Sequence, residues 1–190
     1  MELRRNSVLI MSAPAVAAVL IGALLVSGPL QNTTDKFSEG LGATGYVVIS
    51  VVRDGNEIYH YEDHNLITNA GRNFIAAELG DNDTASTSVA EFIALSTDNT
   101  APAASDTTLA GEITTNGLQR AQGTYAHTVD ADSWTISNTF QATGNHTGVQ
   151  KAGLFTASSS GTMMAENTFS SVNLASGDQL TITWTIDLGL

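Results

Sequence analysis

Three side chains that could bind a metal ion stand at alternate positions of one short stretch: His60, Glu62 and His64. Alternate residues of a β-strand project from one face, so a strand here would place two imidazoles and a carboxylate in a row, and Zn²⁺ accepts both ligand types. Side chains so placed are about 6.5 to 7 Å apart, so they would have to converge and a further ligand would have to come from elsewhere. We therefore favour the solvated end of a β-ribbon and expect no resident metal.

Two acidic segments have the composition of calcium-binding loops, Asp81-Asn82-Asp83 and Asp130-Ala131-Asp132. Carboxylate and amide oxygens are ligands that Ca²⁺ prefers. Neither segment has the spacing of a known calcium loop, so a solvated acidic turn is the preferred interpretation of both. Ca²⁺ is nevertheless the one cofactor that the sequence leaves open, with Asp81 and Asp83 as its candidate ligands.

The sequence carries no arrangement of residues that is typical of catalysis. A Gly-x-Ser-x-Gly motif and the glycine patterns of phosphate-binding loops are both missing, and the chain has no cysteine. Disulfide bonds and thiolate chemistry are therefore excluded. We expect a protein that is not an enzyme, without catalytic or cofactor-binding residues.

Three Asn-x-Thr sequons begin at Asn32, Asn82 and Asn145, and all three fall in segments that we expect to be loops. Loops of an outward-facing domain are where N-glycosylation takes place. These asparagines are therefore candidate glycosylation sites. Because the chain is rich in Asn and Thr, chance occurrence is the alternative explanation.

The chain is strongly acidic, with a formal net charge of −12 and a sequence pI near 4.4. Such a surface repels phosphate groups, so we do not expect a nucleic-acid partner. An acidic surface with little lysine also fits a habitat of high salt. Beyond residue 29 the only cationic side chains are Lys36, Arg53, Arg72, Arg120 and Lys151.

An uncharged apolar run extends from Val8 to Val26, after Arg4 and Arg5 and before Gly28-Pro29. A helix of this length would cover roughly 28 Å, close to the hydrocarbon thickness of a bilayer. We favour a retained single-pass anchor over residues 1–29; a removed signal peptide and a helix buried in an oligomer are the alternatives. The two arginines would keep the amino terminus inside and send the rest of the chain outside.

A polar spacer, residues 30–45, precedes a domain over residues 46–190 that opens with a hairpin, 46–64. Asp54-Gly55 between two strand-like runs predicts its turn. A two-residue turn would pair Arg53 with Asn56, Val52 with Glu57 and Val51 with Ile58. The inner face would then carry Val47, Ile49, Val51 and Ile58.

Thr68 predicts the start of a helix over Asn69–Leu79 that ends at Gly80. Its apolar residues Ala70, Phe74, Ile75 and Leu79 share one side. Further strands are predicted over residues 91–96, 133–142, 149–156, 162–169 and 179–188. The clearest alternation places Trp134, Ile136 and Phe140 on one side of one strand, and Leu180, Ile182, Trp184, Ile186 and Leu188 on one side of another.

These elements predict a mainly β protein: an antiparallel β-sandwich, jelly-roll or immunoglobulin-like, with one short helix. A transmembrane helix would precede the sandwich. With about 160 residues outside the anchor, the chain is long enough for one hydrophobic core.

Four stretches carry motifs that are informative in combination: NLITNAGRNFIAAEL (65–79), FIALSTDNTAPAASDTTLAGEI (92–113), QKAGLF (150–155) and SGDQLTITWTIDL (176–188). In this order they resemble the tail-collar and tail-fibre-type domains of phages and head-tail archaeal viruses. The resemblance spans Asn65 to Leu188, about two thirds of the chain. It implies a small virion β-domain with an assembly or attachment role and no catalytic residues. The anchor and the hairpin depart from the pattern of a plain tail fibre.

Two functions follow from these observations. The first is a membrane-anchored structural protein of a virion, associated with capsid, spike or tail, whose outward-facing domain serves assembly or attachment. The second is a cellular surface filament subunit or adhesin of archaeal type, assembled through its apolar helix and through exchange of the leading hairpin. Both imply a lipid bilayer, further copies of the chain and, for the virion, capsid proteins as partners. Both place the protein in a virion membrane or a cell envelope.

Overall fold

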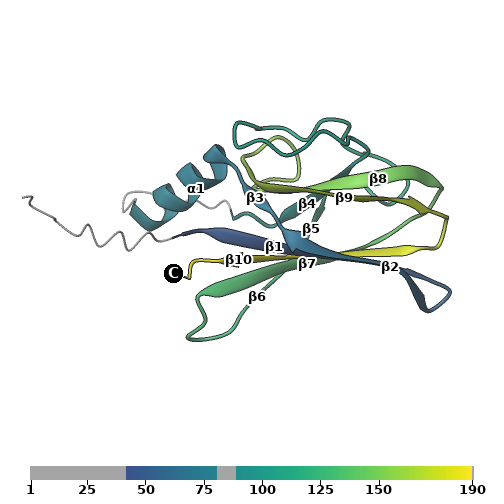
Figure 1. Cartoon of the computed structure of the whole chain (residues 1–190), viewed down its shortest axis with the longest axis horizontal. Helices are drawn as coiled ribbons and strands as arrows, with labels where there is room; N and C mark the ends of the chain where they lie inside the picture. The colour runs from purple at the N-terminus through teal and green to yellow at the C-terminus, as the bar shows by residue number, and fades with distance from the viewer. Residues whose placement is uncertain (1–41, 81–88, 190) are drawn as a thin grey trace, which may run out of the picture. The chain divides into compact units, whose positions relative to one another are not determined.

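The computed structural model describes residues 42–80 and 89–189, which belong to one compact unit, Glu39–Leu190. This unit is mainly β, with two five-stranded antiparallel sheets that face each other and a single described helix (Figure 1). The arrangement is consistent with the predicted β-sandwich. Among the described residues, no helix has the length and apolarity needed to cross a membrane. The predicted anchor, Val8–Val26, lies outside the described residues.

The two sheets differ in which parts of the chain they use. Sheet A comprises, in spatial order, β2 (Asn56–His64), β1 (Thr44–Arg53), β10 (Gln179–Asp187), β7 (Ser133–Gln141) and β6 (Thr124–His127). Sheet B comprises β3 (Leu66–Ile67), β9 (Met163–Leu174), β8 (His146–Phe155), β4 (Phe92–Ser96) and β5 (Ala121–Gln122).

The predicted hairpin is confirmed, with one correction. Asp54 and Gly55 both have positive φ, 50° and 79°, the backbone that a two-residue turn between twisted strands requires. Arg53 pairs with Asn56 and Val52 with Glu57, but a bulge then pairs Val51 with Tyr59.

The prediction that Ile58 joins the inner face is therefore wrong. Ile58 is the extra residue of the bulge and is 47% exposed. Tyr59 and Tyr61 take its place against the core, and their hydroxyls donate to the carbonyls of Ser170 and Thr168 at 2.7 and 3.1 Å. Edge strand β2 is thereby tied to β9 of the opposite sheet.

Alternation on the long strands of sheet A is confirmed. Leu180, Ile182, Trp184 and Ile186 of β10 have no exposed surface, while the threonines between them point outward and keep partial exposure. On β7, Ile136 and Phe140 are buried and Trp134 packs against the core at partial exposure. Trp184 is the largest fully buried side chain, at the centre of a core that both sheets supply.

Helix α1 (Asn69–Gly80) begins as Thr68 predicts. The Thr68 Oγ1 accepts a hydrogen bond from the Gly71 amide at 2.9 Å and donates to the Met163 carbonyl at 2.6 Å. A Cβ at Gly71 would collide with the Met164 carbonyl, so glycine lets the first turn lie directly on β9. The helix therefore starts at a fixed point of sheet B.

Sheet B is covered on both faces, which the sequence did not predict. Residues 93–96 of β4 and 151–155 of β8 are buried without alternation. The segment 97–120 lies over the outer face, where Leu109 packs with Ala94, Phe155 and Met163 in a second apolar cluster. The teal connection above β4 and β9 in Figure 1 is part of this cover. The short strands β3, β5 and β6 were likewise not predicted.

We expect Trp184→Asp to abolish folding. Truncating a buried Trp costs about 3–5 kcal/mol, and an unpaired buried carboxylate adds a further penalty. The check is thermal unfolding followed by circular dichroism, with Gln179→Asp as the control because Gln179 is an exposed residue of the same strand. A cooperative transition in Trp184→Asp at the wild-type temperature would contradict the assigned core.

Candidate functional site

The bulge in β2 turns the sequence-predicted metal ligands outward. The His60 Nδ1 lies 3.0 Å from Glu57 Oε1, and its Nε2 lies 3.8 Å from Glu62 Oε2. The hydrogen bond to Glu57 is the main cause that raises the pKa of His60. His64 instead packs edge-on against Tyr46, with ring centroids 5.6 Å apart. The three predicted ligands thus share a face but do not converge.

The other sequence-predicted sites are only partly described. Asp81, Asn82, Asp83 and Asn32 lie outside the described residues. Asn145 is exposed between β7 and β8, where its Oδ1 accepts from the Ser176 amide at 3.3 Å. Among residues 42–80 and 89–189, no three His, Asp or Glu side chains lie close enough together to hold a metal ion.

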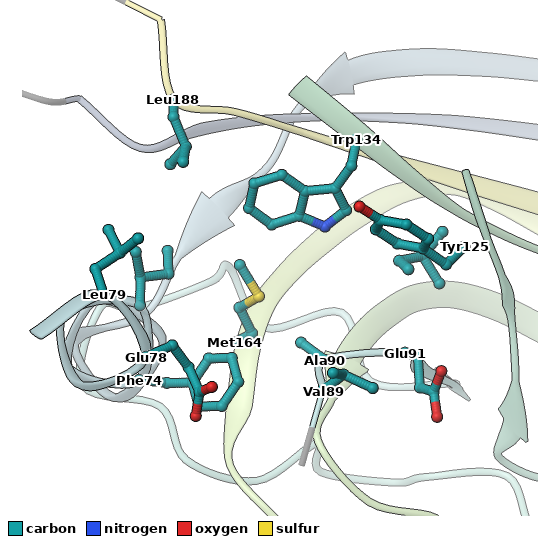
Figure 2. A pocket seen from close by; sticks show the side chains of 12 residues that line it. Phe74, Glu78, Leu79, Val89, Ala90, Glu91, Tyr125, Trp134, Met164 and Leu188 are labelled. Atoms are coloured by element: carbon teal, nitrogen blue, oxygen red, sulfur yellow. The ribbon is translucent and has the colours of Figure 1, made fainter. Parts of the chain in front are cut away.

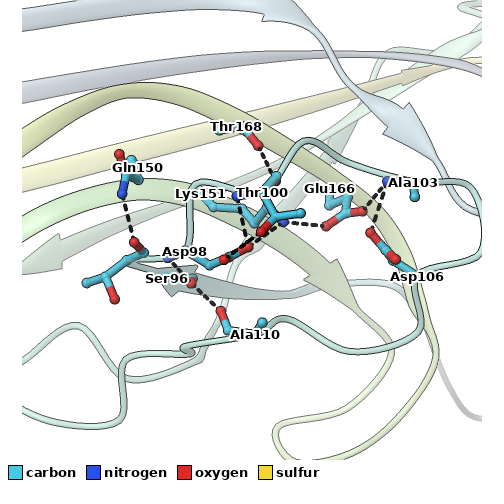
Figure 3. A network of polar contacts seen from close by, with 11 residues as sticks. Ser96, Asp98, Thr100, Ala103, Asp106, Ala110, Gln150, Lys151, Glu166 and Thr168 are labelled. Carbon is cyan, nitrogen blue, oxygen red and sulfur yellow. Dashed lines mark hydrogen bonds and ion pairs between the residues drawn. The ribbon is translucent and has the colours of Figure 1, made fainter.

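A buried polar cluster joins segment 97–120 to sheet B (Figure 3). The Lys151 side chain is only 4% exposed, and its Nζ lies 2.9 Å from Asp98 Oδ2 and 3.5 Å from Glu166 Oε2. Glu166 is 1% exposed and accepts from the Ala103 amide at 3.2 Å. Asp106 accepts from the same amide at 2.9 Å. We call these four ionisable residues, Asp98, Asp106, Lys151 and Glu166, the clamp.

The two acids of the clamp that accept from the Ala103 amide, Glu166 and Asp106, have pKa values shifted in opposite directions. Burial, followed by the adjoining Asp106 carboxylate, raises the pKa of Glu166 to about 7. The hydrogen bond with Glu166 is in turn the main cause that lowers the pKa of Asp106. The hydrogen bond from Lys151 lowers the pKa of Asp98. The buried Lys151 ammonium therefore has Asp98 as its ionised partner.

Two further ion pairs hold turns against the sheets. Arg53, beside the hairpin turn, donates from Nε and Nη2 to Asp178 at 2.8 and 2.6 Å, and Asp178 is buried. Arg120 donates in the same bidentate way to Glu112 at 2.9 and 2.6 Å. Its guanidinium carbon also lies 3.6 Å from the centre of the Phe155 ring. Both arginines are thus used inside the domain.

The outer face of sheet A carries mainly hydroxyl-bearing side chains on its three inner strands, and Asp187, at the end of β10, is the charged residue that the register places on it. Register places Ser50, Thr181 and Thr139 in one row across these strands. Hydroxyls pair between neighbouring strands, Ser137 with Thr183 and Thr139 with Thr181, both at 2.8 Å. We call this array the hydroxyl face; its residues are Tyr46, Val48, Ser50, Thr135, Ser137, Thr139, Thr181, Thr183 and Thr185.

A cavity of about 540 Å³ opens beside α1 (Figure 2). Its walls come from α1, from residues 89–91 before β4, from β6 and β7, from Met164 of β9 and from Leu188 just after β10. Only two of the described lining side chains are charged, Glu78 and Glu91. We call it the α1 cavity; it is lined by Phe74, Ile75, Glu78, Leu79, Val89, Ala90, Glu91, Tyr125, Trp134, Ile136, Met164 and Leu188.

Comparison with known proteins gives no relative: no family model, no curated protein and no solved structure matches this chain.

Sequence reasoning identified neither the clamp nor the α1 cavity. Lys151 and Glu166 stand inside strand-like runs, QKAGLF and MMAENTF, and a charged residue within such a run is a signal of a paired buried charge. The α1 cavity left a weaker signal. Leu79 ends the apolar side of the helix, yet it is 65% exposed because no described residue covers it.

We expect the stability of the protein to depend on pH through Glu166. A carboxyl whose folded pKa is raised from 4.5 to about 7 contributes stability that is complete below pH 4.5 and is lost as the pH rises through 7. Glu166→Gln does not titrate. Between pH 5 and 8, its free energy of unfolding should therefore rise relative to the wild-type value.

The measurement is urea denaturation at several pH values in that window. Glu62→Gln, at an exposed position of β2, is the matched control and should follow the wild-type curve. Parallel curves for Glu166→Gln and the wild type would show that Glu166 does not hold a proton in the folded state.

Proposed function

We propose that this protein is a non-enzymatic structural component of a virion. Its apolar segment Val8–Val26 would anchor it in the virion membrane, and its two-sheet domain would face outward and serve assembly or attachment. The observation that carries this proposal is that the ion pairs of the domain connect its own parts. The clamp, the Arg53–Asp178 pair and the Arg120–Glu112 pair each join one segment of the domain to another. Such pairs rigidify a building block that has no disulfides.

The motifs behind the viral resemblance have structural tasks in this domain. Gly71, in the Asn-x-Gly helix start, lets α1 lie on β9. Lys151 of QKAGLF belongs to the clamp, and Trp184 of the closing strand fills the core. A set of motifs that specifies a rigid fold supports a structural role.

The hydroxyl face is the surface that we propose for contacts between subunits. A neighbour can cover it without burying a charge, and the Ser137–Thr183 and Thr139–Thr181 bonds already satisfy hydroxyls that would otherwise lose water. On a chain of net charge −12, an uncharged face also minimises repulsion between identical copies. These properties support a homo-oligomer.

We include the finer fold type, a jelly-roll or immunoglobulin-like sandwich, in this proposal. It is supported by the repeated passage of the chain between the two sheets, from β2 to β3, β5 to β6, β7 to β8 and β9 to β10. The first and last strands, β1 and β10, also lie side by side. The leading hairpin pairs with β10 of the same chain. This pairing gives no support to exchange of the hairpin between subunits.

We expect membrane association to depend on the apolar segment alone. Val16→Asp combined with Leu20→Asp should remove the full-length protein from liposomes in a flotation gradient, because each carboxylate costs about 2.5–3.5 kcal/mol in a bilayer. Thr114→Asp combined with Gln119→Asp, at exposed positions of the domain, is the control. Thermal unfolding of the domain should be unchanged in both.

Purified virus particles provide the biological half of the test. Mass spectrometry should find the chain in the particles with residues 1–29 intact, released by detergent together with membrane lipid. A mature chain that begins after Ser27 and stays in buffer would overturn the anchor. A chain found in cell-surface filaments and missing from particles would overturn the virion assignment.

A further inference from the structure

The α1 cavity has the size and lining of a binding site. Its volume of about 540 Å³ falls within the roughly 300–1,000 Å³ that is usual for ligand pockets. Three side chains from three different segments are exposed at it: Leu79 by 65%, Val89 by 53% and Tyr125 by 57%. Apolar surface that gathers in this way on a charged protein marks an interaction site.

The charged side chains that line the cavity favour a partner of positive charge. Glu78, on α1, and Glu91, before β4, stand on different walls (Figure 2), and no described lining residue is cationic. One Glu91 oxygen, Oε1, accepts from Gln122 Nε2 at 2.7 Å. Both carboxylates would repel an anionic headgroup and attract an ammonium or guanidinium group.

Aromatic side chains add to the same preference. The Trp134 ring projects into the cavity from β7, with Tyr125 of β6 beside it and Phe74 on the helix side (Figure 2). Aromatic faces attract Arg and Lys and also pack against apolar groups. A partner that combines a cation with an apolar side chain would therefore satisfy both the carboxylates and the rings.

The position of β6 favours a polypeptide over a small amphiphile. β6 (Thr124–His127) is the last strand of sheet A, and within the described residues it pairs only with β7. Its outer edge can therefore accept an added strand. Alternate side chains of that strand would point toward the cavity that Tyr125 lines. A second copy of this domain is disfavoured, because a symmetric contact would bring the same two carboxylates together.

We propose that the α1 cavity and the edge of β6 together bind an extended segment of a partner protein, in which Lys or Arg stands two positions from an aromatic or branched aliphatic residue, so that both point toward the cavity. For its biological setting the proposal rests on the assembly role above, since the partner would be another structural protein. Binding itself requires no membrane, so failure of the anchor and failure of this site are separable.

The test is a titration of the full-length protein in neutral detergent with three synthetic peptides. The first is acetyl-Lys-Thr-Phe-Thr-Lys-Thr-Val-amide, in which both Lys, Phe and Val share one face of a strand; the second has Glu in place of both Lys; the third has Ser in place of Phe and Val. The readout is the Trp134 fluorescence, against a constant background from buried Trp184, together with the NMR signals of the Leu79 and Val89 methyl groups.

We expect saturable binding of the first peptide only, weakening as salt is added. Glu78→Gln combined with Glu91→Gln should reduce its affinity about fivefold, the usual scale for exposed ion pairs. Glu57→Gln combined with Glu62→Gln, on the outer face of β2, should leave it unchanged. Tyr125→Ser should weaken binding while thermal unfolding confirms that the domain is folded.

Four outcomes would overturn the proposal. They are equal binding of the Glu-containing peptide, no saturable change with any peptide, the same spectral changes with phosphatidylcholine vesicles, and the same changes on raising protein concentration alone. The last two would assign the cavity to lipid or to a second copy.

Discussion

The structure depends on a buried lysine. Lys151 lies among side chains of sheet B, where an unpaired ammonium group would be too costly to keep. Asp98 Oδ2 and Glu166 Oε2 lie 2.9 and 3.5 Å from its Nζ, and Asp98, its ionised partner, comes from the segment that covers the sheet. Segment 97–120 therefore does two things at once: it covers the outer face of sheet B, and through Asp98 it neutralises Lys151. Long irregular segments are uncommon in compact domains, and this one is fixed by charge as well as by Leu109.

The two sheets consequently have different roles. Sheet B is enclosed, by sheet A on one side and by segment 97–120 on the other. The outer side of sheet A presents hydroxyl and methyl groups over its central strands, with the charged side chains of Asp187 and of the edge strand β2 around them. The apolar side chains of the α1 cavity lie at the edge where the sheets part. A rigid acidic domain that carries the hydroxyl face and the α1 cavity is suited to contacts with other proteins, which agrees with the assembly role that we propose.

The sequence predicted a strand well where only one side of that strand is covered, and less well where both sides are covered. Leu180, Ile182, Trp184 and Ile186 alternate with threonines because only one side of β10 meets the core, so the pattern predicted the strand and its buried face. Thr68 and Asp54-Gly55 predicted a helix start and a turn, because both act through local backbone chemistry.

Features that depend on distant parts of the chain were not predictable in the same way. Relative to the predicted pairing, the bulge at Ile58 moves His60 and Glu62 to the opposite face of the sheet. The alternation of residue types along a strand does not reveal such a one-residue shift. The pairing of Lys151 with Asp98 joins residues 53 positions apart. The α1 cavity combines six separate segments, and no single motif marks it.

Hydrogen exchange of Lys151→Met tests the central claim most directly. The clamp predicts that the amides of Asp98, Ala103 and Ile113, which bond within or across segment 97–120, exchange at least about a hundredfold faster than in the wild type, the scale of a broken buried ion pair. Amides of β1 and β10 should keep their protection. Unchanged exchange at those three positions, or an equal loss of protection throughout both sheets, would contradict the account.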